Sequence, residues 1–276
     1  MRPLLTTAKA AAVAAPLLNT VKAAAIAAAV LLVPVVASVD ARAQEHEVIH
    51  LPDTKFSFEG PFGTFDRASA QRGFQIYKEV CSNCHSMRQL SYRNLTGIGL
   101  NAGQIAALAS QFQVQDGPND NGEMFERPAR ASDRFRRPFQ NDAAARAANN
   151  GALPPDLSVI IKAREGGADY VHALLTGYAD PPPGMTIAEG MNYNKYFPGH
   201  QIAMAAPLNT EGQVEFADGT KGTIDQMATD VVTFLSWAAE PELEQRRAMG
   251  VRMVIFLTIL GGLAYAVKRK IWADLH

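Results

Sequence analysis

The sequence predicts an all-α protein, in which a helical domain with long irregular loops precedes one C-terminal transmembrane helix. Apolar residues recur at helical spacing over residues 69–80 and again over residues 223–239. A third observation is the apolar run over residues 249–267, which is long enough to span a membrane. A chain of 276 residues can form one large domain or two modest ones with a sizeable core, and it shows no internal repeat.

A pentapeptide, C-x-x-C-H, directly follows the first of these helices and holds the only two cysteines, Cys81 and Cys84. Thiols three positions apart on a short helical segment can each bond one vinyl group of a single porphyrin. His85 then directs its imidazole at the iron. This spacing is the attachment signature of c-type haem. We therefore expect one haem c, covalently attached, with His85 as an axial ligand.

Two other interpretations of the pentapeptide are weaker. A zinc half-site needs a second pair of ligands, and the chain has no further cysteine. A thioredoxin-like redox pair needs a preceding strand, whereas residues 69–80 have the apolar spacing of a helix.

Residues 1–43 are predicted to be a signal peptide. Arg2, Lys9 and Lys22 form a basic region, an alanine-rich apolar stretch follows, and residues 41–43 offer a small-x-small cleavage site before Gln44. The alternative is an uncleaved anchor, which the weak apolarity of alanine and an interrupting proline disfavour. Export to the bacterial periplasm, or its mitochondrial equivalent, also fits covalent haem attachment.

The domain should begin with an extended arm, residues 45–66, because that stretch is rich in glycine and proline and lacks helical periodicity. We expect helices over residues 69–80 and 101–112. Residues 115–150 have the composition of a long irregular surface excursion. Three aromatic residues argue for its partial packing: Phe125, Phe135 and Phe139.

Two short helices are expected over residues 158–164 and 168–176, with Asp156 as a helix N-cap. Residues 212–219 resemble a short hairpin. Thr223 and Gln226 predict a capping box at the start of the strongest soluble helix, residues 223–239. Its buried face should pack on the helix before the haem motif and comprises Ile224, Met227, Val231, Phe234, Leu235 and Ala238.

The last apolar run predicts a membrane anchor, with Arg252 snorkelling to one interface. The alternative is a buried core helix, which the flanking basic residues 268–270 disfavour. Basic residues lie at both ends, so the positive-inside rule does not orient the helix. The predicted export signal and the covalent haem instead place the haem domain on the outer side of the membrane. We expect a domain over residues 44–245, an anchor over 246–270 and a cytoplasmic tail over 271–276.

The near-neutral net charge of −1 hides an acidic domain: residues 44–248 carry 18 Lys and Arg against 25 Asp and Glu, a net charge of −7. The net acidic charge argues against nucleic-acid binding, which needs a basic face. An acidic surface suits a basic protein partner, and the alternative is ordinary solubilising charge. Candidate contacts are Asp116, Asp120, Glu123 and Glu126.

An electron-transfer haem needs a second axial ligand, and a methionine thioether gives a higher potential than a second imidazole. Met204 is the first candidate, because its loop of small residues, stiffened by Pro207, lets the backbone approach a porphyrin. Met185 and Met191 follow, and His200 and His172 are rivals. Other methionines are assigned to the excursion, a helix face or the anchor: Met124, Met227, Met249 and Met253.

The sequence resembles the cytochrome c1 family, whose members carry the haem of the ubiquinol–cytochrome c oxidoreductase, or cytochrome bc1 complex. A helix running into C-x-x-C-H resembles the first helix of the cytochrome c fold. The resemblance covers nearly all of the mature chain and rests on residues 56–60, 72–77, 143–158, 169–171, 174–178, 202–204 and 234–241 with the C-terminal anchor.

This resemblance implies Cys81 and Cys84 as thioether sites, and His85 and Met204 as axial ligands. It further implies that Arg164 and Tyr170 line the haem pocket near the propionates, and that Pro155 belongs to a haem-contact loop. Some bacterial members carry a disulfide near the methionine loop that this chain lacks. Packing and Pro207 alone are therefore expected to hold Met204.

The family's role implies electron transfer from a Rieske iron–sulfur protein to a soluble cytochrome c, respiratory or photosynthetic, with no substrate chemistry on this subunit. Implied partners are cytochrome b and membrane lipid in a dimeric complex of the inner membrane. One alternative is an anchored c-type cytochrome that serves a different oxidase or reductase. A monohaem enzyme such as a peroxidase, which needs an open iron position, is another.

Overall fold

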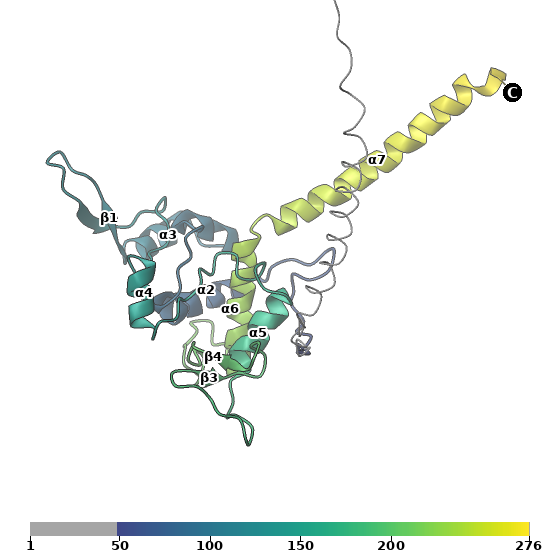
Figure 1. The fold of residues 1–276 in the computed structure, drawn as a ribbon. Helices are drawn as coiled ribbons and strands as arrows, with labels where there is room; N and C mark the ends of the chain where they lie inside the picture. Colours follow the sequence, from purple (N-terminus) through teal and green to yellow (C-terminus); the bar gives the residue numbers. More distant parts are fainter. Residues whose placement is uncertain (1–48, 276) are drawn as a thin grey trace, which may run out of the picture. The chain divides into compact units, whose positions relative to one another are not determined.

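Two helices from opposite ends of the domain form the centre of the fold. The computed structural model describes residues 49–275, and in it α2 (Arg67–Glu79) packs against α6 (Ile224–Ala239) (Figure 1). A Cβ built on Gly73 would stand 2.0 Å from the carbonyl oxygen of Asp230, so this close approach requires glycine. The predicted packing of the late helix on the helix before C-x-x-C-H is confirmed.

A buried ion pair joins the same two helices. Arg72 of α2 donates two hydrogen bonds of 2.8 Å to the fully buried carboxylate of Asp230, and a third of 2.8 Å to Asp218. The Asp230 contact raises the pKa of Arg72 above its ordinary value. The backbone N–H of Thr220 and the Arg72 guanidinium lower the pKa of Asp218 to about 2. Removing Arg72 would leave a buried, unpaired carboxylate, at a cost of about 3–5 kcal/mol.

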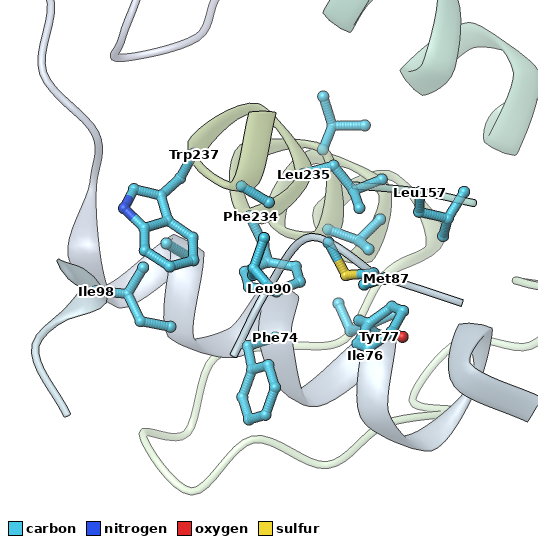
Figure 2. Packing of buried hydrophobic residues seen from close by; sticks show 14 of the residues in the cluster. Phe74, Ile76, Tyr77, Met87, Leu90, Ile98, Leu157, Phe234, Leu235 and Trp237 are labelled. Atoms are coloured by element: carbon cyan, nitrogen blue, oxygen red, sulfur yellow. The ribbon is translucent and has the colours of Figure 1, made fainter. Parts of the chain in front are cut away.

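The apolar core fills the space around this crossing. Figure 2 shows side chains of α2 and α6 with residues of the intervening loops, among them Met87, Leu90 and Leu157. The rings of Phe74 and Phe234 meet with centroids 5.5 Å apart. Five members of the predicted α6 face are buried, and Ile224 is half-buried: the buried ones are Met227, Val231, Phe234, Leu235 and Ala238.

Side chains cap both central helices at their N-termini. Asp66 accepts hydrogen bonds from the N–H groups of Ala68 and Ser69, which starts α2 two residues before its predicted start. Thr223 accepts from the N–H of Gln226 at 3.1 Å. The predicted capping box is only half formed, because the Thr223 N–H donates to the Lys221 carbonyl at 2.9 Å and not to the Gln226 side chain.

The elements that lie between α2 and α6 in the sequence are short, as expected for a domain with long loops. In chain order the structure gives η2 (Cys81–Asn83), η3 (Tyr92–Ile98), α3 (Ala102–Ala109), β1 (Gln113–Asp116), β2 (Phe125–Pro128), α4 (Asp142–Ala148), α5 (Gly167–Thr176), β3 (Asn192–Tyr193), β4 (Gln201–Ile202), and, after α6, α7 (Leu243–Ile271) and η4 (Ala273–Leu275). The predicted helices over 101–112 and 168–176 correspond to α3 and α5.

The predicted excursion over residues 115–150 is more regular than expected. β1 and β2 pair antiparallel over four residues each, and α4 follows. Neither face of the hairpin is buried, so most strand positions are polar. The sequence therefore lacks the alternation of apolar and polar residues that would predict the two strands. Phe135 is buried and Phe139 half-buried, as expected for partial packing, but Phe125 is 42% exposed.

Two further local predictions are wrong. Residues 158–164 form turns and not a helix, because the Asp156 carboxylate binds the N–H of Ser158 and the glycines at 166 and 167 leave too short a stretch. Residues 212–219 form no strand. The Gly212 N–H instead donates to the Gly222 carbonyl at 2.7 Å and closes the segment as a loop.

The C-terminal helix α7 runs without interruption across the predicted domain boundary at residues 245 and 246. It is long and apolar enough to cross a membrane, and its apolar side chains from Met249 onward are exposed. Residues 49–66 contain no helix or strand, as predicted for the arm. The predicted signal peptide, residues 1–43, lies outside the described residues.

Candidate functional site

The C-x-x-C-H motif forms one tight turn at the end of α2. The N–H groups of Cys84 and His85 both donate to the Cys81 carbonyl, at 3.1 and 2.9 Å. The two thiols therefore project from one short 3-10 segment. Burial raises the pKa of the Cys81 thiol to about 12. A thiol held protonated is unlike the activated thiolate of a redox pair.

The His85 ring is oriented by the backbone of a distant loop. Its Nδ1 lies 2.8 Å from the Pro155 carbonyl oxygen. A carbonyl can only accept, so Nδ1 carries the proton and Nε2 keeps its lone pair, the arrangement that metal-ligating histidines adopt. Burial lowers the pKa of His85, although the Pro155 hydrogen bond and the Asp156 charge oppose it. The imidazole is therefore neutral at pH 7, which is the form that binds iron.

Asp156 fastens the loop after His85 to the loop that carries Pro155. Its carboxylate accepts from the Ser86 hydroxyl at 2.7 Å, and from the backbone N–H groups of Arg88 at 2.8 Å and Ser158 at 3.0 Å. Burial alone would raise the pKa of Asp156, but these hydrogen bonds outweigh it and the pKa is lowered. The sequence suggested Asp156 only as a helix cap. In the structure it organises the surroundings of His85.

Met204 lies in the loop after β4 and is half-buried. Its carbonyl oxygen accepts from the Tyr178 hydroxyl at 3.0 Å and from the Asn192 amide at 3.4 Å. The prediction that packing and Pro207 alone hold this loop is therefore wrong. Burial raises the pKa of Tyr178, so the hydroxyl stays a donor at neutral pH.

Arg164 lies just before α5, and Tyr170 lies in its first turn. Tyr170 is half-buried and Arg164 is exposed, with its guanidinium on the carbonyl of Ala163 at 2.9 Å. Burial raises the pKa of Tyr170, and the positive charge of Arg164 opposes that rise. Tyr170 in turn adds to the rise in the pKa of Tyr178.

Of the four rivals of Met204, the structure argues against His172 alone. The His172 ring is buried, with Nδ1 3.4 Å from the Thr54 hydroxyl and Nε2 3.3 Å from that of Thr229, so it joins the arm to α6. Met227 is fully buried in the core, and Met249 and Met253 lie on α7, as predicted. Met185, Met191 and His200 are half-buried in the loops around β3 and stay alternatives.

Sequence reasoning missed the residues that hold Met204, whereas the family resemblance had implied Pro155, which orients His85. Tyr178 and Asn192 have no spacing relative to Met204 that would mark them. The one available signal is the general rule that a buried tyrosine hydroxyl needs a hydrogen-bond partner.

The residues present fit a covalently attached haem. They supply two thiols on one turn, an imidazole with its Nε2 lone pair available, and a thioether in a loop anchored by its backbone. Within residues 49–275 no group of three His, Cys, Asp or Glu side chains could hold a bare metal ion. A cavity of about 310 Å³ beside the motif is lined by Ser82 and Asn83 and not by the cysteines or His85.

Comparisons with known proteins agree with this site. The model of the Cytochrome C1 family matches residues 56–275. Cytochrome c1-2, heme protein, mitochondrial, of Solanum tuberosum is 47% identical over 87% of this chain and 92% of its own length. The corresponding protein of Saccharomyces cerevisiae is 48% identical over 84% of this chain and 75% of its own length. Cytochrome b/c1 of Bradyrhizobium diazoefficiens is 49% identical over 86% of this chain, and the match spans 37% of that longer protein.

A family match over residues 56–275 includes both candidate ligand segments and α7. Together with relatives that are nearly half identical over most of this sequence, it is far more specific than the pentapeptide alone. The chain belongs to the cytochrome c1 family.

Proposed function

We propose that this chain is the haem-bearing electron-transfer subunit of a ubiquinol–cytochrome c oxidoreductase, passing single electrons from a Rieske iron–sulfur protein to a soluble cytochrome c. The observation that carries the proposal is the His85 ring, held by the Pro155 carbonyl at 2.8 Å directly after the paired cysteines. Family membership supports the same assignment, because the relatives are named as haem proteins.

Each site residue has a role in this proposal. Cys81 and Cys84 would hold one haem c through two thioethers, and His85 Nε2 and the Met204 thioether would be the two protein ligands of its iron. Arg164 and Tyr170 line the pocket near the propionates. A haem bound in this way supplies a one-electron ferric–ferrous couple whose potential the thioether raises. The chain itself transforms no substrate.

The hydrogen bonds of the protein support a carrier role. The Pro155 carbonyl fixes the tautomer of His85, and Asp156 keeps the two loops together, so neither needs to rearrange when the charge of the site changes. The Tyr178 and Asn192 contacts likewise hold the Met204 backbone. A site whose ligands stay in place in both oxidation states costs little reorganisation energy during transfer.

We propose the topology from the apolar helix α7 and from the basic, alanine-rich composition of residues 1–43. We expect cleavage of the signal peptide 1–43, a periplasmic haem domain over 44–245, an anchor over 246–270 and a short cytoplasmic tail, in a bacterial inner membrane or its mitochondrial equivalent. The helix α7 is 29 residues long and apolar enough to span the bilayer. Its exposed apolar side chains would be covered by lipid and by partner helices, which we propose are those of cytochrome b in a dimeric complex.

The acidic residues expected to meet a basic cytochrome c lie on or beside the β1–β2 hairpin. Three of them are exposed, whereas Asp116 also pairs with Arg127. That ion pair lowers the pKa of Asp116, and the positive charge of Arg127 partly neutralises the carboxylate. Asp120, Glu123 and Glu126 are therefore the stronger candidates for docking by charge attraction.

A pyridine haemochrome spectrum of the purified membrane protein tests the proposal. The expected spectrum is that of one haem with both vinyl groups saturated, in a preparation that contains a multi-haem b-type subunit. A spectrum with free vinyl groups would contradict covalent attachment. Copurification with a different oxidase or reductase would support the alternative assignment, and carbon monoxide binding by the ferrous protein would indicate an open-site enzyme.

A further inference from the structure

The loop between Phe58 and Gly63, called here the junction loop, carries a large apolar side chain that the core does not cover. Phe62 is 81% exposed, more than any other large apolar side chain that the structure gives as exposed in the described residues. Single exposed apolar residues are common on protein surfaces. The position of Phe62 relative to α7 makes this one informative.

The junction loop is fastened to the first turns of α7. The Arg247 guanidinium donates to the carbonyl oxygens of Phe58 and Gly63, both at 2.7 Å, and so binds the two ends of the loop. Glu244 accepts from the N–H of Phe65 at 2.8 Å. The loop is therefore held beside residues 244–247 of α7.

The backbone of the junction loop makes its tip stiff. Gly60 has a φ of +68°, which favours glycine, and Pro61 follows it. A Cβ built on Gly63 would stand 2.0 Å from the Glu59 carbonyl oxygen, so the two ends of the loop approach closely. Phe62 is thus presented at the tip of a closed turn.

The depth of the junction loop follows from the geometry of α7. A helix rises about 1.5 Å per residue, so Arg247 lies roughly 3 Å beyond the exposed apolar segment that starts at Met249. The headgroup layer on each side of a bilayer is about 5–7 Å thick. If α7 spans the membrane, the loop lies at the depth of the headgroups.

We propose that the junction loop is a second membrane contact, in which Phe62 inserts its ring at the boundary between headgroups and acyl chains. This inference rests on the proposed role of α7 as the anchor. Aromatic rings favour that boundary. The residues around Phe62 are Glu59, Gly60, Pro61 and Gly63, which form no contiguous apolar patch of the kind that binds another protein. The contact would fix the tilt of the haem domain relative to the membrane.

Site-directed spin labelling of the full-length holoprotein in phosphatidylcholine–phosphatidylglycerol vesicles tests the proposal. The wild-type chain should take no label, because thioether formation consumes both native thiols. Phe62→Cys carries the nitroxide at the loop, Met253→Cys is the control for the anchor, and Asn121→Cys in the β1–β2 turn is the exposed control. The measured quantity is the ratio of relaxation by oxygen, which partitions into lipid, to relaxation by a water-soluble nickel chelate.

The expected ratio at Phe62→Cys is several-fold above that at Asn121→Cys and below that at Met253→Cys. A lipid-like ratio at Met253→Cys with a water-like ratio at Phe62→Cys would overturn the membrane contact and leave the anchor intact. A water-like ratio at Met253→Cys, or labelling of the wild-type chain, would overturn the proposed function as well. In the whole complex, loss of both relaxation effects at Phe62→Cys would show that a protein subunit covers the ring, which also contradicts the proposal.

Discussion

The two candidate ligands are held in different ways. The segment after His85 is tied to residues 155–158 by a dense set of hydrogen bonds, and Met87, Leu157 and Ser158 are buried around it. The loop around Met204 has exposed alanines on both sides of the methionine, and two hydrogen bonds reach the Met204 carbonyl.

This difference suggests that the residues around His85 determine the stability of the fold, whereas the Met204 side chain determines the reduction potential of the haem. The surroundings of His85 are part of the core, so changes there should affect stability and assembly. The methionine loop lies outside it, so changes at the Met204 side chain should leave the fold in place and alter the haem. The predictions below test that separation.

Met204→Leu should produce the largest effect. Loss of the thioether should lower the reduction potential by a large fraction of the ~0.8 V range that axial ligands set, while thermal unfolding stays close to that of the wild type. Redox titration measures the potential. Met191→Leu, in a neighbouring loop, is the control and should leave the potential unchanged. An unchanged potential in Met204→Leu would move the assignment to Met185, Met191 or His200.

Cys84→Ser should leave haem attached through at most one thioether and lower the amount of assembled protein. Cys81 and Cys84 are the only thiols of the chain, so no other residue can replace the lost bond. The pyridine haemochrome spectrum should shift to that of a haem with one free vinyl group. Covalent attachment through two thioethers in this variant would be incompatible with the assigned motif.

Asp156→Asn should destabilise the His85 side by about 2–3 kcal/mol, the usual range for a lost charged hydrogen-bond acceptor. Denaturant unfolding followed by haem absorbance measures it, with the exposed Asp120→Asn as control. Because the folded-state pKa of Asp156 is lowered, its contribution is present at neutral pH and is lost as the pH falls through that pKa. The free energies of unfolding of the wild type and of Asp156→Asn should therefore become equal at low pH. A difference that persists there would show that the charged carboxylate is not the cause of the stabilisation.

Tyr178→Phe should cost about 0.5–1.5 kcal/mol, because it removes one hydrogen bond to the Met204 carbonyl. We expect weaker retention of the methionine, measured as faster carbon monoxide binding by the ferrous protein. Tyr196→Phe is a matched control, since its hydroxyl makes no hydrogen bond within the described residues. Equal rates in both variants would show that Tyr178 does not hold the loop.

Charge reversal on the hairpin should have the smallest effect. The rate of cytochrome c reduction should fall as salt rises, since the Debye length is about 8 Å at physiological ionic strength. Glu123→Lys together with Glu126→Lys should flatten that dependence. A rate independent of salt in the wild type would mean that docking is chiefly apolar.

Long-range periodicity made the framework of this fold predictable. The faces of α2 and α6 and the length of α7 follow from the spacing of apolar residues, so their packing and exposure were anticipated. The β1–β2 hairpin was not, because both of its faces are polar. Residues 158–164 were mistaken for a helix because the Asx turn at Asp156 and a helix N-cap have the same local sequence.

The site was predictable only where its chemistry is local. Cys81, Cys84 and His85 form one motif, and the small residues around Met204 made it the first candidate before the family resemblance implied it as a ligand. The contacts of Pro155 with His85 and of Tyr178 with Met204 join residues 70 and 26 positions apart. Such contacts depend on the tertiary fold and leave no periodic signal in the sequence.

Near-infrared magnetic circular dichroism of the oxidised holoprotein would identify both axial ligands at once, because the ligand-to-iron charge-transfer band separates histidine–methionine ligation from bis-histidine ligation. We predict the histidine–methionine band in the wild type, its loss in Met204→Leu and its retention in Met191→Leu. A bis-histidine band in the wild type, or a band that survives in Met204→Leu, would contradict the assignment of His85 and Met204 as the pair that holds the haem iron.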